Sequence, residues 1–286
     1  MIDTTPHIIT SLLAMGMALA FIIADRRSPT SRALALFLAS VGISIGVGSQ
    51  IAYPLHRTQG IAWWDGVFAI PEALAFFFAY EWILRVRRTV PARNLKTRGP
   101  DSLLRIAQGL TVFYAVMSLA YPLVRVEKFV NAGFKEVFER GSPEFWMFAL
   151  PLTISLALAL FSGLLMLRRR PDRAEALRLI AFAVAAPFMA SGLVLPNNIA
   201  PVTTAIGLLI FLVGGVQYHV IQGRRAQFMS RFLSPQVAEL VGRRGLKSAT
   251  DEQTLELSVV CCDLRGFTAF IAATSSQKVM RILREY

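Results

Sequence analysis

Hydrophobic residues dominate the chain as far as residue 221, and they fall into seven long stretches separated by short polar segments. Each stretch is close to or above the roughly 20 apolar residues that a helix needs to cross the hydrocarbon core of a bilayer. The stretches cover residues 7–24, 33–55, 66–84, 103–124, 145–167, 177–195 and 201–221. The pattern therefore predicts an α-helical polytopic membrane protein, with seven transmembrane helices in a module over residues 1–221.

After residue 221 the apolar stretches become shorter and polar residues more frequent. Ser234 followed by Pro235 is typical of a helix start, and the apolar positions that follow have helical spacing. We expect residues 222–254 to form a transducer helix and a polar linker. The β-branched run at 255–262 then predicts a strand, and residues 255–286 are expected to begin a further domain.

Lysine and arginine are distributed unevenly between the segments that separate the stretches. Fifteen lie in or beside the segments after stretches one, three and five, whereas five lie in the alternate segments. Cytoplasmic segments of membrane proteins carry the excess of these residues, so the N-terminus is predicted to be external and the C-terminal region cytoplasmic. The formal net charge of +12 is therefore explained by this asymmetry across a lipid bilayer. We expect the bilayer as a partner and no nucleic acid.

Three features of the module bear on its packing and its surfaces. Gly42 and Gly46 have the G-x-x-x-G spacing that lets two helices approach closely, either within one protomer or between two. Residues 127–139 form either a short amphipathic helix on the outer surface or a solvated loop. Tryptophans stand at the external ends of stretches three and five, as interfacial aromatic residues do; they are Trp63, Trp64 and Trp146.

Few ionisable residues lie within the stretches, and these are candidates for function because a charge is costly in lipid. Glu72, together with His7 and His56 near the external ends of their stretches, forms a candidate ligand site for an unknown small-molecule or lipid stimulus. The alternative is that Glu72 makes an interhelical hydrogen bond and that the histidines are polar helix ends. Glu81 lies nearer the inner boundary and is expected to pair with Arg85 one turn later. No lysine lies within a stretch, which excludes a retinal Schiff base.

Residues 259–268 read Val-Val-Cys-Cys-Asp-Leu-Arg-Gly-Phe-Thr. They predict a strand that ends at Asp263, a turn at Gly266 and a helix that begins near Phe267. Carboxylates bind Mg²⁺ and helix N-termini attract anions, so this arrangement favours metal-bound phosphate as its ligand. Taken alone, an acid after an apolar strand is more often a turn former.

With Phe232-Leu233-Ser234-Pro235 upstream and an amphipathic helix downstream, this stretch resembles the start of the class III adenylyl/guanylyl cyclase domain. The close match covers residues 259–268, and a looser one extends over 231–286. Cys261-Cys262 replaces the family's usual Phe-Ala, and Leu264 replaces its Ile, while the acid and the glycine remain. The resemblance implies that residues 255–286 begin a cytosolic α+β domain.

The resemblance also implies roles for particular residues. Asp263 would be the first of two metal-binding aspartates, and the backbone carbonyl of Leu264 would add a ligand to two Mg²⁺ or Mn²⁺ ions. The backbone N–H groups of Gly266, Phe267 and Thr268 would contact the triphosphate of the nucleotide. The metals would activate the 3′-hydroxyl and stabilise charge on the α-phosphate during in-line attack.

The whole protein would then be an adenylate cyclase of the bacterial inner membrane, acting as a homodimer on ATP, with GTP as the other possible substrate. The second metal-binding aspartate, the base-selecting residues and the Asn/Arg pair that supports the transition state would lie beyond Tyr286. The 286 residues are therefore expected to be a catalytically incomplete part of a longer protein. The alternative is a membrane receptor or scaffold with a vestigial cyclase portion. A transporter is a weaker interpretation because no paired interrupted stretches are visible.

Overall fold

The computed structural model describes residues 4–89, 98–131, 142–167, 173–192, 195, 199–230 and 265–285. The chain divides into two compact units, Met1–Phe228 and Met229–Tyr286. The long helices of the first unit are α1 (Thr5–Ala24), α2 (Pro29–Val47), α4 (Ala69–Thr89), α5 (Arg98–Ala120), α8 (Pro143–Leu167), α9 (Arg173–Ser191) and α10 (Ala200–Ser230).

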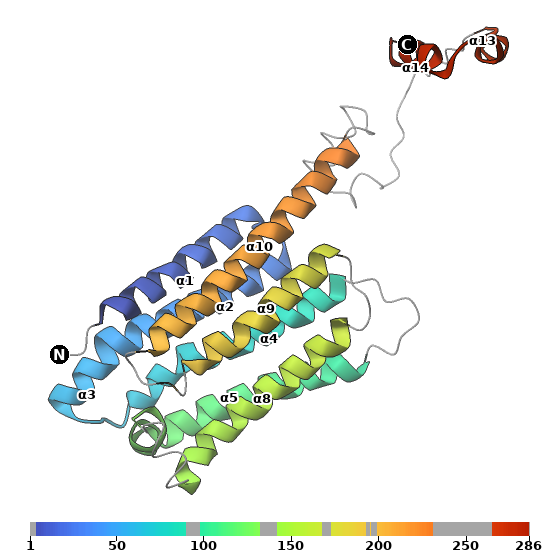
Figure 1. Cartoon of the computed structure of the whole chain (residues 1–286). Helices are drawn as coiled ribbons and strands as arrows, with labels where there is room; N and C mark the ends of the chain where they lie inside the picture. The colour runs from blue at the N-terminus through green and yellow to red at the C-terminus, as the bar shows by residue number, and fades with distance from the viewer. Residues whose placement is uncertain are drawn as a thin grey trace, which may run out of the picture. The chain divides into compact units, whose positions relative to one another are not determined.

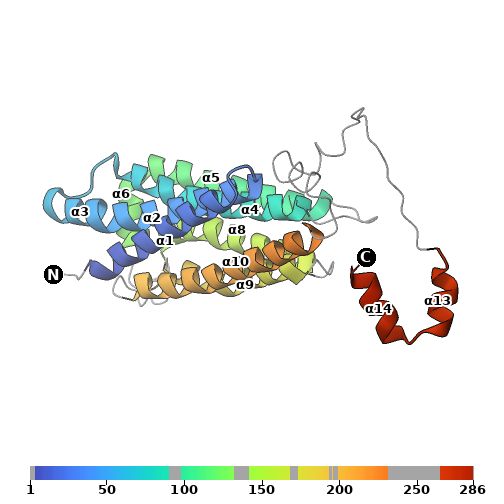
Figure 2. The same cartoon turned by 90° about the horizontal axis from the view of Figure 1, so that it is seen from above.

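These helices lie side by side and alternate in direction (Figure 1). In the series α1, α2, α4, α5 and α8, each helix packs against the next. Helices α9 and α10 lie together on one side of the others (Figure 2). One end of the bundle therefore carries the start of α1, the start of α4, the end of α9 and the start of α10. We call it the N-terminal end.

Six helices within the described residues are long and apolar enough to cross a membrane. They are Thr5–Ala24, Pro29–Gln59, Asp65–Arg87, Pro100–Ala120, Pro143–Leu165 and Ala200–Arg225. The remaining stretch of the sequence prediction, 177–195, corresponds to α9, whose apolar part Ala176–Ser191 is shorter. The fold is that of a polytopic helical membrane protein, as the apolar pattern predicts.

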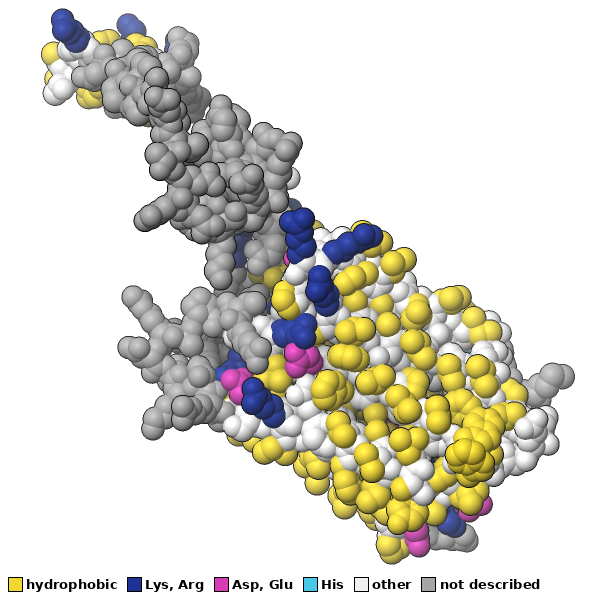
Figure 3. All heavy atoms as spheres, turned by 180° about the vertical axis from the view of Figure 1, so that it is seen from behind, with side chains coloured by type: hydrophobic (Ala, Val, Ile, Leu, Met, Phe, Trp, Pro, Cys, Tyr) yellow, Lys and Arg dark blue, Asp and Glu magenta, His cyan; other side chains and the backbone are white. Residues whose placement is uncertain are grey.

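The surface of the first unit fits this conclusion. Hydrophobic side chains cover the face shown in Figure 3, and Lys and Arg side chains gather at one end of it. Trp63, Trp64 and Trp146 are exposed, as expected of aromatic residues at a membrane interface.

Prolines coincide with irregular turns in two helices. The π-helix η1 (Gly48–Ala52) joins α2 to α3 (Tyr53–Gln59). It ends two residues before Pro54, whose missing N–H cannot complete a regular helical bond. The predicted stretch 103–124 contains a break near its end. There α5 ends at Ala120, Tyr121 leaves the helical conformation (φ −127°), and Pro122 begins α6 (Pro122–Val124), since the first position of a helix tolerates proline best.

A further π-helix, η3 (Arg125–Val130), follows α6. It covers the start of the segment 127–139, for which the sequence left a helix and a loop as alternatives. Residues 132–139 of that segment lie outside the described residues.

The two glycines of the G-x-x-x-G spacing lie where α2 crosses α1. Ser11 of α1 donates a hydrogen bond from Oγ to the carbonyl oxygen of Gly42, at 2.7 Å. A Cβ atom at Gly42 would lie 3.0 Å from the carbonyl oxygen of Ser11, and one at Gly46 would lie 2.9 Å from Ser11 Oγ. Of the two alternatives that the sequence left open, the glycines therefore serve helix packing within the protomer.

A cluster of aromatic rings joins α9 and α10 to the other helices. Trp82 of α4 is fully buried, and its ring centroid lies 5.1 Å from that of Phe182 on α9 and 5.5 Å from that of Phe211 on α10. The guanidinium of Arg178 lies over the rings of Trp82 and Tyr218, at 5.4 and 4.3 Å from their centroids. Aromatic pairs of this kind contribute beyond their buried area, so the cluster helps to fix α9 and α10.

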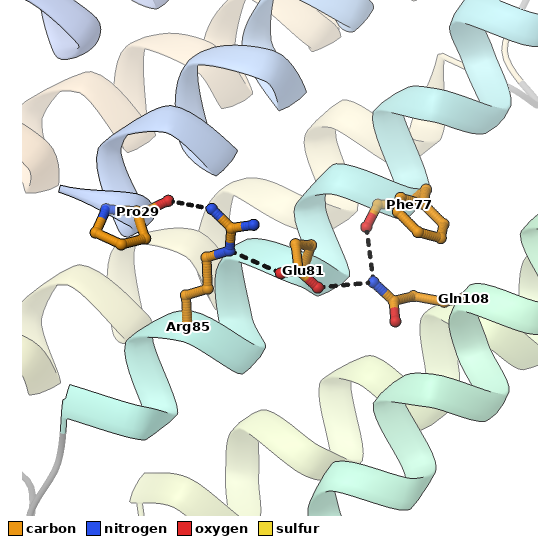
Figure 4. Close-up of polar contacts among 5 residues, drawn as sticks. All are labelled: Pro29, Phe77, Glu81, Arg85 and Gln108. Atoms are coloured by element: carbon orange, nitrogen blue, oxygen red, sulfur yellow. Dashed lines mark hydrogen bonds and ion pairs between the residues drawn. The ribbon is translucent and has the colours of Figure 1, made fainter. Parts of the chain in front are cut away.

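Polar contacts at the end of the bundle opposite the N-terminal end hold α4 to its neighbours (Figure 4). Glu81 accepts a hydrogen bond from Nε of Arg85 at 2.7 Å, which confirms the predicted pair. Arg85 also donates to the carbonyl oxygen of Pro29 at 2.6 Å. Gln108 of α5 donates to Glu81 at 3.3 Å. One carboxylate thus links α4 to α5 directly and to α2 through Arg85.

The described part of the second unit is a turn and two helices, α13 (Phe267–Ala273) and α14 (Ser276–Glu285). Gly266 precedes α13 with φ +74°, a conformation that glycine adopts without strain. The helix predicted to begin near Phe267 is therefore confirmed. The predicted strand 255–262, the linker, and the transducer helix beyond Ser230 lie outside the described residues.

We predict that replacing Gly42 by leucine destabilises the first unit, because the new side chain would meet the backbone of Ser11. Overpacking of this kind costs about 1–3 kcal/mol. Gly16 provides a matched control on α1, since a Cβ there would meet nothing within 4 Å. Thermal unfolding in detergent should show a lower midpoint for Gly42→Leu than for Gly16→Leu. Equal midpoints would contradict the close α1–α2 contact.

Candidate functional site

The first unit contains a partly open cavity of about 370 Å³ between the helices. Its walls come from α1, α2, η1, α3, α4, α9 and α10, and η3 contributes Arg125. The three candidate residues of the membrane module, His7, His56 and Glu72, all line this one cavity. The structure thus brings together residues that are far apart in the sequence.

Glu72 is held by a cation and a phenol from two other elements. Arg125 of η3 donates from Nη2 to Glu72 Oε2 at 2.7 Å, and the hydroxyl of Tyr114 on α5 donates to the same oxygen at 3.0 Å. Arg125 Nε also donates to the Tyr114 oxygen at 3.1 Å. Arg125 is buried and Glu72 nearly so. The pair therefore compensates two charges that would be costly in an apolar environment.

This arrangement uses only one of the two carboxylate oxygens of Glu72. Oε1 is buried and has no hydrogen-bond partner among the described residues, and the same is true of Nδ1 of His7. Buried polar atoms are usually paired, and an unpaired one costs about 1–3 kcal/mol. The interhelical bond expected as the alternative role of Glu72 is therefore present, and one oxygen remains available to a further donor.

His56 lies beside a buried acid at the same end of the bundle. Its Nε2 atom is 3.2 Å from Oδ2 of Asp65, which begins the 3₁₀-helix η2 (Asp65–Phe68). Asp65 Oδ2 also accepts a hydrogen bond from the backbone N–H of Ala62 at 2.6 Å. The contact connects the end of α3 to the loop before α4, so Asp65 orients His56 at the edge of the cavity.

Farther from the N-terminal end, the cavity walls become apolar. Phe76 of α4, Phe37 of α2 and Phe182 of α9 contribute rings, and Ala186 adds to the α9 side. The hydroxyl of Tyr80 in this part is satisfied within the protein, because it shares a 2.9 Å hydrogen bond with Ser155. Nearer the N-terminal end, Thr204 donates to the carbonyl oxygen of Ala200 at 2.9 Å.

Of the predicted metal- and phosphate-binding residues of the second unit, the structure describes only the phosphate-binding ones. Gly266, Phe267 and Thr268 form the turn and the first residues of α13. Asp263 and Leu264, the predicted metal ligands, lie outside the described residues. Among the residues that the structure does describe, no group of three or more His, Cys, Asp or Glu side chains is placed to hold a metal ion.

Sequence reasoning missed Arg125, Tyr114 and Asp65, which fix Glu72 and His56. Arg125 counted only as one of the five cations of the external segments. A signal was available for Arg125, because a buried glutamate in lipid requires a compensating cation and Arg125 is the first one after the fourth stretch. Nothing in the sequence connects Tyr114 to this pair.

Comparison of the chain with protein-family models, with curated proteins and with solved structures finds no match.

We predict that Glu72→Leu strongly destabilises the first unit, because it leaves the buried guanidinium of Arg125 without its carboxylate. Breaking a buried pair in this way costs about 3–5 kcal/mol. The double variant Glu72→Leu/Arg125→Met should recover most of that loss. Unfolding in detergent measures both effects, and Glu144→Leu, an exposed acid in the first turn of α8, is the control. A Glu72→Leu variant as stable as the control would contradict the importance of the pair.

Proposed function

We propose that this protein is a membrane-anchored class III nucleotide cyclase, which converts ATP to cyclic AMP and diphosphate as a homodimer. The helical membrane module serves as its anchor and as its sensor or regulator. Asp263 and the Leu264 carbonyl hold Mg²⁺ or Mn²⁺, and the backbone N–H groups at Gly266, Phe267 and Thr268 contact the triphosphate.

The observation that carries the proposal is the run Asp263-Leu264-Arg265-Gly266-Phe267-Thr268 at the end of a predicted strand. The backbone at Gly266 supports it, because the positive φ explains why a glycine stands at this turn. The helix that begins directly afterwards at Phe267 supports it as well. A carboxylate, a glycine turn and a helix start in this order suit the binding of a metal–phosphate group.

Chemically, the two metal ions would act on both ends of the reaction. One would lower the barrier to deprotonation of the 3′-hydroxyl, and both would offset the charge that develops on the α-phosphate. Because each site of a class III cyclase is built from two chains, the membrane module would control catalysis through the relative position of two C-terminal segments.

The test is cyclic nucleotide synthesis by the complete gene product in membranes, with ATP and GTP compared. We expect cyclic AMP from ATP in the presence of Mg²⁺ or Mn²⁺ and none after chelation. Asp263→Asn should lower the rate on the order of 10²–10³-fold, as removal of other groups that stabilise transition-state charge does. Asp251→Asn, in the predicted linker, should leave the rate unchanged.

Two outcomes would contradict this proposal. Near-wild-type activity of Asp263→Asn would remove the metal role from that residue. Absence of any cyclic nucleotide product, with membrane insertion intact, would favour a receptor with a vestigial cyclase portion.

The cytoplasmic position of the catalytic segment requires an odd number of crossings from an external N-terminus, so α9 should cross as well. Its apolar part, Ala176–Ser191, is shorter than the usual span, and local thinning of the bilayer or protein neighbours on both sides would accommodate it. Its packing between the aromatic rings of α4 and α10 supports this assignment.

Cysteine labelling in intact cells tests this topology in a chain whose own Cys261 and Cys262 are replaced by serine. Arg173→Cys at the start of α9 and Ile199→Cys just before α10 should respond differently to an impermeant maleimide. We expect Ile199→Cys to react in intact cells and Arg173→Cys to react only after permeabilisation. Equal reaction of both in intact cells would contradict a crossing by α9.

A further inference from the structure

The cavity of the first unit combines a polar end with an apolar body, and this combination specifies a class of ligand. Its volume of about 370 Å³ lies within the range of roughly 300–1,000 Å³ that small-molecule sites occupy. Along α4 the wall extends from Glu72 to Tyr80, a distance of roughly 12 Å at about 1.5 Å per helical residue. The cavity is therefore elongated enough for a chain-like molecule.

The polar end sets the requirement for the head of that molecule. Glu72 and Arg125 neutralise each other through their 2.7 Å contact, so a head with a net charge would meet no opposite charge left to balance it. Oε1 of Glu72 lacks a hydrogen-bond partner among the described residues. A carboxylate oxygen only accepts, so the head must donate a hydrogen bond.

The apolar body sets the requirement for the rest of the molecule. The rings of Phe37, Phe76 and Phe182 line it, and the hydroxyl of Tyr80 is bonded to Ser155. Water in this part would find few partners, whereas a hydrocarbon chain would bury its surface favourably.

We infer that this cavity binds an uncharged amphiphile with a hydroxyl head and a single hydrocarbon chain, of the class of long-chain alcohols and monoacylglycerols. The head lies at Glu72 and His7, and the chain lies between α2, α4 and α9. The ligand comes either from the bilayer or from outside the cell.

The position of the cavity relates such a ligand to the proposed regulatory role. Pro201 and Thr204, in the first two turns of α10, are part of its wall. The 31-residue α10 continues without a break to Ser230, about 46 Å along its axis. An occupant therefore touches the start of the helix that leads toward the second unit. Binding itself does not depend on the proposed catalytic function.

The experiment uses the whole chain in nanodiscs of a saturated phosphatidylcholine and a hexadecanol that carries a diazirine in its chain. We expect saturable photolabelling on the α2, α4 and α9 walls of the cavity, near Phe37, Phe76 and Phe182. Excess unlabelled hexadecanol should suppress the labelling, while hexadecanoic acid and hexadecylamine should compete about tenfold more weakly, which corresponds to about 1.4 kcal/mol.

Two variants of α9 separate binding in the cavity from adsorption to the outer surface. Ala186 is buried and lines the cavity, whereas Val184 is exposed on the same helix. Ala186→Trp should fill the cavity and lower the labelling about tenfold, and Val184→Trp should leave it unchanged. If Ala186→Trp does not fold, the competition series on the unmodified chain carries the test.

Mass spectrometry of extracts from the purified chain distinguishes the sources. A co-purifying hydroxyl amphiphile would support a bilayer source, and binding of the added probe without one would support an external source. Non-saturable labelling, equal competition by the charged analogues, or equal labelling of a folded Ala186→Trp variant would overturn the inference. Because the readout is binding, failure of the cyclase assay leaves this result intact.

Discussion

The interior of a bilayer offers no hydrogen-bond partners, and this constraint shapes every part of the first unit. Backbone groups satisfy one another within helices, and the hydroxyls of Ser118 and Ser155 donate to carbonyl oxygens of their own helices. Glu72 cannot be satisfied in this way, so Arg125 and Tyr114 converge on it from other elements. The polar end of the cavity is thus a consequence of compensating one buried acid.

Much of the fold follows from the apolar pattern, because lipid imposes length and composition on each helix separately. Hydrophobicity alone does not show the break at Tyr121, although Pro122 marks it in the sequence, and it does not show the short apolar part of α9. The local pair of Glu81 and Arg85 was predictable from its spacing. For Glu72 the sequence signals only the need for a cation. That Arg125, 53 positions away, supplies it depends on how whole helices pack.

The two candidate sites differ in how far sequence alone specifies them. The segment around Asp263 is local, so ten consecutive residues suggest its chemistry and the backbone of Gly266 agrees with the expected turn. The cavity is non-local, and its seven or more contributing elements become neighbours only after folding. A ligand site of that kind leaves only isolated polar residues in a sequence, as His7, His56 and Glu72 illustrate.

The contact of Gly42 and Gly46 with Ser11 also limits how two copies of the protein can associate. Small-residue faces are common contact surfaces between transmembrane helices, but α1 already covers this one. Large aliphatic side chains remain on the outside of the bundle, for example Leu12, Leu19 and Ile106, and offer a second copy another kind of contact surface. Such faces pack less closely than glycine faces, and two protomers joined through them could change their relative rotation without separating.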